Sequence, residues 1–124
     1  MAISKTNLEL STMVFEAFND RDFSIIEPWM DENIYLDFPG VKPVEGKRKF
    51  LIFTSALLRS YPRLIFSVHD ILLDGDKSCI IWTNEGLDSF GKRYANRGVT
   101  LVEIRDGKIS LLSDYFKDTS FTNK

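Results

Sequence analysis

Residues 98–117 read GVTLVEIRDGKISLLSDYFK, and this stretch contains the clearest strand pattern of the chain. Two mainly apolar runs, 98–105 and 108–117, lie on either side of the Asp-Gly pair at 106–107. An Asp-Gly pair between two such runs is typical of the tight turn of a β-hairpin. The stretch therefore predicts two neighbouring antiparallel strands.

Asp114 is the residue of this hairpin that needs an explanation, because its neighbours are apolar. Leu111 and Leu112 precede it, and Tyr115 and Phe116 follow it. Side chains alternate between the two faces of a strand, so Asp114 shares a face with Leu112 and Phe116. If that face lines an interior cavity, the carboxyl group lies in the cavity too. We therefore treat Asp114 as the first candidate for a chemically active group.

The rest of the chain divides into helical and strand patterns. Apolar residues recur at three- and four-residue spacing in the helical segments and at alternate positions in the strands. Helices are predicted over 4–19, 22–30 and 47–60, and further strands over 33–38, 64–73 and 77–88. Ser4 or Thr6 can cap the first of these helices. Pro28 leaves the end of the second helix open, and a loop is expected around residues 89–98.

This order of elements predicts an α+β fold. Three N-terminal helices would pack on a strongly curved, mainly antiparallel sheet, because consecutive hairpins join antiparallel neighbours. A sheet that wraps around helices in this way forms a cone whose interior is lined by alternate strand residues. No repeat, linker or low-complexity segment divides the chain, so residues 1–124 are expected to form one domain.

Composition and charge exclude several classes of function. The formal net charge is -2, and nothing in the sequence resembles the positive surface of a nucleic-acid-binding protein. No apolar run approaches the roughly 18 residues that a membrane span needs, and no signal-peptide pattern is present, so a cytoplasmic protein is expected. Cys79 is the only cysteine, which excludes an internal disulfide framework. Ten phenylalanines suit a thick core or an apolar pocket.

Three segments of the chain carry a family resemblance: 17–40 (AFNDRDFSIIEPWMDENIYLDFPG), 68–86 (VHDILLDGDKSCIIWTNEG) and 96–116 (NRGVTLVEIRDGKISLLSDYF). They resemble the SnoaL-like and ketosteroid isomerase-like proteins of the nuclear transport factor 2-like superfamily. The closing SDYFKD, residues 113–118, is similar to the limonene-1,2-epoxide hydrolase-like branch. The resemblance covers roughly residues 8–119 and implies a cystatin-like α+β barrel. That fold hosts isomerases, cyclases, hydrolases and non-catalytic binders.

The ketosteroid isomerase-like branch stabilises a dienolate with a tyrosine and a protonated acid, and it moves the proton with a carboxylate. The resemblance puts Val14 at the tyrosine position, Phe38 at the carboxylate position and Thr100 at the acid position. Asp37 would reach the carboxylate position only after a one-residue slip. The alternation within 33–38 directs Phe38 inward and Asp37 outward, so steroid-type isomerisation is disfavoured.

The epoxide hydrolase-like and cyclase-like branches are matched only in part. The first uses two aspartates with an arginine between them, and Asp114 matches the aspartate of its last strand. Arg97 is the one charged neighbour that we can name for Asp114, either as a catalytic partner or in a structural ion pair. Val99 stands where the second aspartate is expected. In the SnoaL-like cyclases the base falls at a position that is Lys117 in this chain.

His69 and Trp82 are further candidates outside the last hairpin. His69 is the only histidine, and imidazole is the side chain that exchanges protons near neutral pH, although the pattern of 64–73 leaves its direction open. Trp82 would either form a flat wall against an apolar ligand or belong to the core. One histidine and one cysteine make a zinc site unusual, so neither a metal nor another cofactor is predicted.

Two functions fit these observations. The first is a small cofactor-free enzyme, of isomerase, cyclase or hydrolase type, that performs general acid–base chemistry on a small hydrophobic molecule. The second is a non-catalytic domain that binds a small apolar ligand. A homodimer is also expected, because the outer face of a curved sheet is available for a partner. The predicted catalytic residues are Asp114, Arg97, Thr100 and His69, and the predicted ligand-binding residues are Phe38, Trp82, Leu112, Phe116 and Val14.

Overall fold

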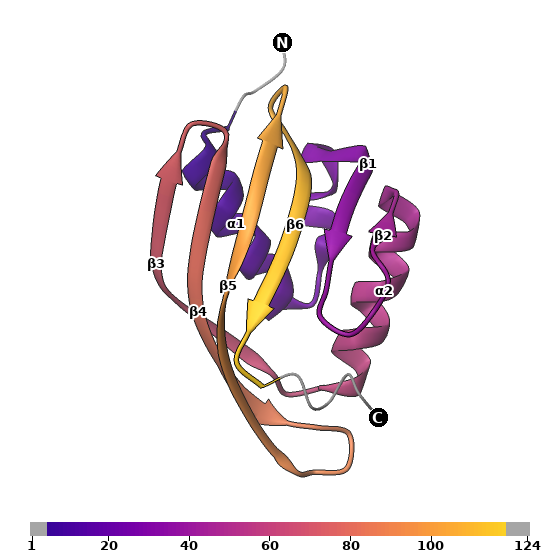
Figure 1. The fold of residues 1–124 in the computed structure, drawn as a ribbon. Coiled ribbons are helices and arrows are strands. Elements are labelled where there is room, and N and C mark those ends of the chain that lie inside the picture. Colours follow the sequence, from indigo (N-terminus) through magenta and orange to yellow (C-terminus); the bar gives the residue numbers. More distant parts are fainter. Residues whose placement is uncertain (1–4, 119–124) are drawn as a thin grey trace.

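A six-stranded sheet curves around two α-helices in the computed structural model, which describes residues 5–118 (Figure 1). The predicted α+β fold with a curved, mainly antiparallel sheet is confirmed. No helix within the described residues is long and apolar enough to span a membrane. In chain order the elements are α1 (Asn7–Asp20), η1 (Phe23–Ile25), η2 (Glu27–Trp29), β1 (Met30–Asp37), β2 (Val44–Glu45), α2 (Lys47–Ser60), β3 (Ile65–Asp74), β4 (Lys77–Leu87), β5 (Arg93–Arg105) and β6 (Lys108–Phe116).

The order of the strands places the first long strand beside the last. The sheet runs β2-β1-β6-β5-β4-β3, and both α-helices lie behind it in Figure 1. Strands β3 to β6 follow one another as antiparallel neighbours, whereas β1 and β6 run parallel. In this pair Leu36 lies opposite Leu112, and Asp37 lies opposite Ser113. Phe38, which directly follows β1, therefore comes to the same part of the inner face as Asp114.

Helix α1 begins with a capping box. The backbone N–H of Glu9 donates to the Thr6 hydroxyl at 3.1 Å, and the backbone N–H of Thr6 donates to the Glu9 carboxylate at 3.0 Å. These bonds satisfy N–H groups that find no partner inside the helix. Thr6 is therefore the cap, and Ser4 lies outside the described residues. The helix buries Leu10 and Val14 completely in the core.

The predicted helix over residues 22–30 is wrong, because the chain forms the two short 3-10 turns η1 and η2 instead. The Asp22 carboxylate accepts from the backbone N–H of Ser24 at 3.0 Å and holds the first turn. Pro28 has no N–H to donate and disfavours helical backbone at the residue before it, so no longer helix forms. The described residues therefore contain two α-helices and not three.

Strand β5 begins earlier than the sequence predicts. The expected loop around 89–98 is shorter, because residues 93–97 already pair with β4. Asp88 holds the tip of the hairpin by accepting from the backbone N–H groups of Phe90 and Lys92, each at 2.9 Å. The β4–β5 hairpin therefore extends beyond the other strands at the lower end of Figure 1.

A glycine allows β5 to approach β6 closely. Gly98 lies opposite Phe116. A Cβ atom built on Gly98 would lie 2.7 Å from Phe116 Cβ and closer still to the Tyr115 carbonyl oxygen. A side chain has no room at this point, so glycine is needed for the close packing that shapes the inner face.

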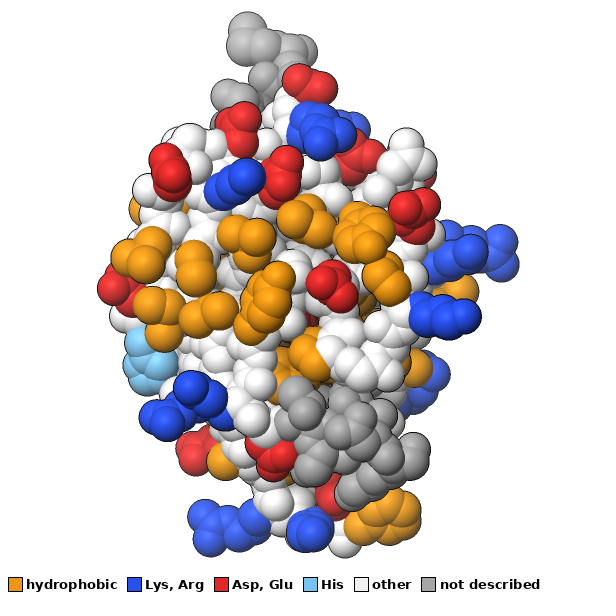
Figure 2. Space-filling model, in the orientation of Figure 1, with side chains coloured by type: hydrophobic (Ala, Val, Ile, Leu, Met, Phe, Trp, Pro, Cys, Tyr) orange, Lys and Arg blue, Asp and Glu red, His pale blue; other side chains and the backbone are white. Residues whose placement is uncertain are grey.

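The outer face of the sheet carries an apolar band across its middle (Figure 2). Outward-facing side chains of adjacent strands lie next to one another in two rows. We call these residues the outer band: Leu72, Cys79, Leu101, Ile81, Val99 and Tyr115. Their neighbours along the strands point the other way, and Ile80 and Val102, for example, are fully buried in the core.

Candidate functional site

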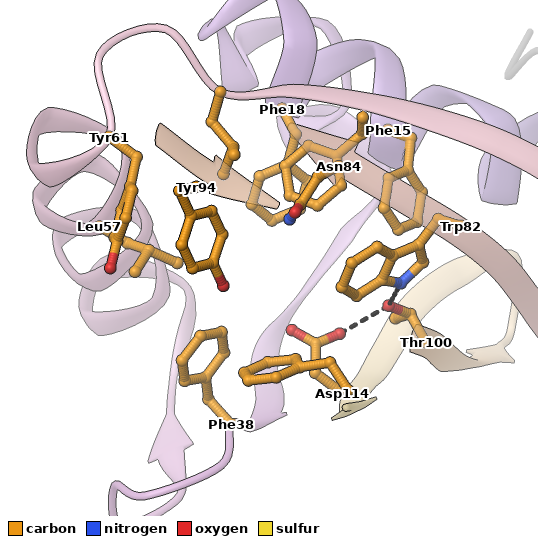
Figure 3. A pocket seen from close by; sticks show the side chains of 13 residues that line it. Phe15, Phe18, Phe38, Leu57, Tyr61, Trp82, Asn84, Tyr94, Thr100 and Asp114 are labelled. Atoms are coloured by element: carbon orange, nitrogen blue, oxygen red, sulfur yellow. Dashed lines mark hydrogen bonds between the residues drawn. The ribbon is translucent and has the colours of Figure 1, made fainter. Parts of the chain in front are cut away.

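A cavity lies between the inner face of the sheet and the two helices (Figure 3). Its free volume is about 40 Å3. This volume holds only one or a few water molecules, so a larger occupant needs some of the lining side chains to turn. The cavity is lined by Phe15, Phe18, Phe38, Leu57, Tyr61, Leu64, Phe66, Trp82, Asn84, Tyr94, Thr100, Asp114 and Phe116.

Aromatic rings form most of the cavity wall. Trp82 packs edge-on against Phe66, with ring centroids 5.3 Å apart. Phe38 packs in the same way against Phe116, also at 5.3 Å. Edge-to-face pairs of this kind stabilise the fold beyond the area that they bury. The wall is therefore apolar and offers ring faces and edges to a small molecule.

Asp114 on β6 ends a chain of two hydrogen bonds that starts at Trp82. The indole N–H of Trp82 donates to the Thr100 hydroxyl oxygen at 2.9 Å, and the Thr100 hydroxyl donates to Asp114 Oδ1 at 2.6 Å. The direction of this chain is fixed because an indole nitrogen can only donate. Since Oδ1 already accepts a hydrogen bond, a proton on Asp114 belongs on Oδ2, the oxygen that faces the cavity (Figure 3).

The pKa of Asp114 is raised from its ordinary value of 3.8 to about 6. Burial is the largest cause, because a poorly solvated site disfavours the charged form of a carboxyl group. The hydrogen bond from Thr100 lowers the pKa of Asp114, and the nearby Asp37 carboxylate raises it by charge repulsion. Asp114 keeps some accessible surface, but this surface borders the cavity, so we treat its carboxyl group as desolvated.

A second polar group, the side-chain amide of Asn84, enters the cavity from β4. Asn84 is 7% exposed, and its carbonyl oxygen Oδ1 is buried without a hydrogen-bond partner among the described residues. Tyr94 lines the same region, and burial raises the pKa of its phenol to about 12, so it stays neutral at physiological pH. Sequence reasoning missed both residues. The alternation of residues 77–88 could have found Asn84, because it shares a face with Trp82.

A family model matches most of the chain. The model described as the SnoaL-like domain covers residues 12–112. The chain belongs to the SnoaL-like domain family. The resemblance inferred from the sequence is therefore confirmed, while the closer similarity of the last strand to the epoxide hydrolase-like branch stays a prediction. A comparison of this SnoaL-like domain with curated proteins finds no match.

Solved structures share the fold of this SnoaL-like domain over nearly its whole length. An NTF2-like protein of unknown function from Burkholderia pseudomallei K96243 has a TM-score of 0.84 at 13% identity, over 94% of this chain and 95% of that chain. A proposed SnoaL-like polyketide cyclase from Jannaschia sp. CCS1 has a TM-score of 0.82 at 20% identity, over 94% and 89%. TerC, co-crystallised with polyporic acid, has a TM-score of 0.81 at 18% identity, over 94% and 95%. At these identities the likeness shows the fold alone.

Five of the predicted site residues of this SnoaL-like domain meet at the cavity: Asp114, Thr100, Phe38, Trp82 and Phe116. The two remaining predicted ligand-binding residues do not line it. Val14 is 0% exposed and Leu112 is 1% exposed, and both belong to the hydrophobic core. Both face inward as expected, but packing between the helices and the sheet fills the space around them.

Arg97 and His69 do not reach the cavity, which corrects two predicted catalytic positions. Arg97 alternates with the inward-facing Asn96 and Gly98, so its exposed side chain lies on the outer face. His69 lies at a bulge in β3, and its Nε2 is 2.7 Å from the hydroxyl of Thr83, which also faces outward. The sheet therefore separates both side chains from the carboxyl group of the cavity.

Side chains that bind metals do not gather within residues 5–118, where no group of three or more His, Cys, Asp or Glu could hold an ion. The only histidine, His69, and the only cysteine, Cys79, lie on the outer face. Asp114 is the one acidic side chain among the residues that line the cavity. The absence of a metal or cofactor stays a prediction.

Proposed function

We propose that this SnoaL-like domain is a general acid–base enzyme, of isomerase, cyclase or hydrolase type, that acts on a small and mostly apolar molecule in the cavity. Asp114 is the group that transfers the proton. One observation carries the proposal: Oδ2 of Asp114 faces an aromatic cavity and has no hydrogen bond from the described residues. This oxygen is therefore the point at which the chain offers a proton acceptor to a ligand.

The chemistry follows from the protonation state of Asp114. Since the pKa of Asp114 is about 6, the carboxyl group is ionised in most molecules at neutral pH, and this form can act as a base. Oδ2 would take a proton from a carbon next to a carbonyl group, and the C–H electron pair would move into the enolate. Returning the proton from Oδ2 to another carbon completes an isomerisation. If the enolate carbon instead attacks a second carbonyl carbon, Oδ2 returns the proton to the new alkoxide and a ring closes.

A second function, binding without catalysis, is favoured by one observation. The described lining of the cavity contains a single acid and no side chain of opposite charge. Acid–base enzymes commonly combine a base with a group that stabilises the developing charge. TerC, a protein of the same fold, is co-crystallised with polyporic acid, which supports a small organic ligand for either function.

Replacement of Asp114 by asparagine tests the proposal. Epoxides, steroids and polyketides would be incubated with the wild type, and products measured by mass spectrometry. With any compound that is turned over, we expect Asp114→Asn to lower kcat/KM about 100- to 10,000-fold, because the proton acceptor is lost. The wild-type rate should rise with pH through about 6 if Asp114 acts as a base.

Asp37→Asn is the matched control for this experiment. Asp37 lies on the outer face of the sheet, where its Oδ2 accepts from the Ser113 hydroxyl at 3.2 Å. Its removal should preserve kcat and move the pH profile to lower pH, because the Asp37 charge no longer raises the pKa of Asp114. Full activity of Asp114→Asn would contradict the enzymatic role. Ligand-induced stabilisation without turnover of any compound would favour the binding function.

We infer that two copies of the chain associate through the outer band. Apolar side chains extend across four adjacent strands of this face, and the chain's net charge of -2 opposes self-association only weakly. A second copy of the chain would cover these side chains and leave the cavity, on the opposite face of the sheet, unobstructed. A cytoplasmic location is retained as a prediction from the sequence.

A further inference from the structure

Two asparagines that face each other on adjacent strands differ in their hydrogen bonds. Asn84 on β4 lies opposite Asn96 on β5, and they are 7% and 9% exposed. The Asn96 amide is fully bonded: Nδ2 donates to the Tyr94 hydroxyl and to the Asp118 carbonyl oxygen, both at 2.8 Å, while Oδ1 accepts from the backbone N–H groups of Arg97 (2.9 Å) and Asp118 (3.0 Å). Asn84 forms no side-chain hydrogen bond with any described residue, and its Oδ1 is buried.

The amide of Asn84 points into the cavity, not into the packed core. It lines the same space as Asp114, and Figure 3 shows the two side chains entering that space from different sides. A buried carbonyl oxygen that receives no hydrogen bond from the protein stabilises the fold less than an apolar side chain would at this position. Such a group is expected where a ligand supplies the missing partner.

We infer that Asn84 binds a hydroxyl group of the ligand, and this inference rests on the proposed function because it assigns a second contact in the same cavity. The unpartnered atom is a carbonyl oxygen, so the ligand must donate. The donor is neutral, because no acid other than Asp114 lines the described cavity to pair with a cation. A hydroxyl is the smallest neutral donor, and the remainder of the ligand requires lining side chains to turn, because the free volume is only about 40 Å3.

The strand register separates this contact from the reacting end of the cavity. Asn84 lies opposite Asn96, whereas Asp114 lies opposite Thr100, four residues further along β5. Four residues of a strand span about 13 Å. The ligand is therefore a flat, mostly apolar molecule with a hydroxyl group at one end and the proton taken by Asp114 near the other.

A pair of probes of the same shape tests the assignment. p-Cresol and p-xylene differ by a hydroxyl group in place of a methyl group, and their dissociation constants would be measured by NMR titration of the wild type, Asn84→Leu and Asp114→Asn. We expect the preference for p-cresol over p-xylene to fall at least tenfold in Asn84→Leu, because leucine cannot accept the hydroxyl hydrogen bond. Asp114→Asn should keep the wild-type preference.

Each other outcome overturns the inference. An unchanged preference in Asn84→Leu, or binding of neither probe to the wild type, would exclude the contact with Asn84. Loss of the preference in Asp114→Asn alone would place the hydroxyl at Asp114. That result would contradict the role of Asn84 and would leave the proposed function unaffected. Full turnover by Asp114→Asn would contradict the proposed function but would not change the preference for p-cresol.

Thermal unfolding without ligand provides an independent measurement. Asn84→Leu should melt at or above the wild-type temperature, because it removes an unpartnered amide. Asn96→Leu, the matched control, should melt several degrees lower because it breaks four hydrogen bonds. Asn84→Ala removes the amide without adding bulk and gives the same test. A decrease for both Asn84 variants as large as for Asn96→Leu would show that the protein itself satisfies Asn84, and would overturn the inference.

Discussion

The carboxyl group of Asp114 has one oxygen bound by Thr100 and the other directed at an apolar cavity. Alternation along the last strand is enough to predict that Asp114 faces the same way as Phe116. The raised pKa of Asp114 could not be predicted in this way, because it depends on burial by residues from other strands and on Asp37 of β1. Its charge state is therefore a property of the assembled sheet.

Folding stability should depend on pH through Asp114. Its pKa rises from 3.8 to about 6 on folding, so the folded state binds this proton more tightly than the unfolded state. The resulting stabilisation is complete below about pH 4 and is lost as the pH rises through about 6. We expect Asp114→Asn, which stays neutral, to gain up to about 3 kcal/mol relative to the wild type between pH 4 and pH 8.

Urea unfolding of both proteins at pH 4 and pH 8 measures this difference. Titrating groups other than Asp37, whose charge interacts with Asp114, affect the two proteins equally and cancel in the comparison. A difference between wild type and Asp114→Asn that is the same at both pH values would show that the carboxyl group is solvated in the folded state.

At the scale of the elements, side chains at the end of α1 form hydrogen bonds with the backbone at the end of α2 and at the start of β3. Arg21 follows α1 in the left-handed region, with φ of 57°. Its guanidinium group donates to the carbonyl oxygens of Leu58 at 2.8 Å and Tyr61 at 2.6 Å. The Asn19 amide exchanges two hydrogen bonds with the backbone of Phe66, at 2.8 and 2.9 Å. These bonds position Tyr61 and Phe66, which line the cavity.

Two substitutions of Arg21 separate the effects of its guanidinium hydrogen bonds and of its left-handed backbone conformation on the free energy of unfolding. Arg21→Ala removes the guanidinium hydrogen bonds and keeps a side chain in the left-handed region, so we expect a loss of about 1–2 kcal/mol in unfolding free energy. Arg21→Gly loses the same bonds but relieves the backbone conformation, and should be about 1 kcal/mol more stable than Arg21→Ala. Chemical denaturation of the three proteins gives both values. Equal stability of Arg21→Ala and wild type would show that the hydrogen bonds contribute nothing.

At the scale of the whole molecule, the proposed dimer predicts a concentration-dependent mass. Leu101 lies in the middle of the outer band, next to Cys79 on one side and Ser113 on the other. Leu101→Lys should convert the dimer to a monomer, because it would bury two ammonium groups in an apolar interface. Size-exclusion chromatography with light scattering at micromolar concentration measures the mass.

Phe90→Lys is the control for the dimer. Phe90 is 93% exposed at the tip of the β4–β5 hairpin, away from the outer band, so its substitution should leave the mass unchanged. A wild type that is monomeric at micromolar concentration would refute the dimer.

Local sequence patterns were enough to predict most of the helices and strands and the directions of most side chains. Residue periodicity located the helix over 47–60 and the last hairpin, and alternation correctly directed Phe38 and Asp114 inward. These features are local, because period and turn chemistry act between residues close in the chain. The second predicted helix failed for a local reason as well, since Pro28 restricts the backbone to short turns.

Which polar groups meet depends on contacts between segments that are distant in the chain. Parallel pairing of β1 with β6 brought Phe38 to Asp114. The early start of β5, whose residues 93–97 already pair with β4, placed Arg97 on the opposite face. Asn84 and Asn96 are the same residue type in facing positions, yet among the described residues only the side chain of Asn96 has hydrogen-bond partners. Hydrogen bonding and desolvation depend on atoms that distant segments contribute, and for that reason the chemistry of the cavity emerges only when the sheet closes over the helices.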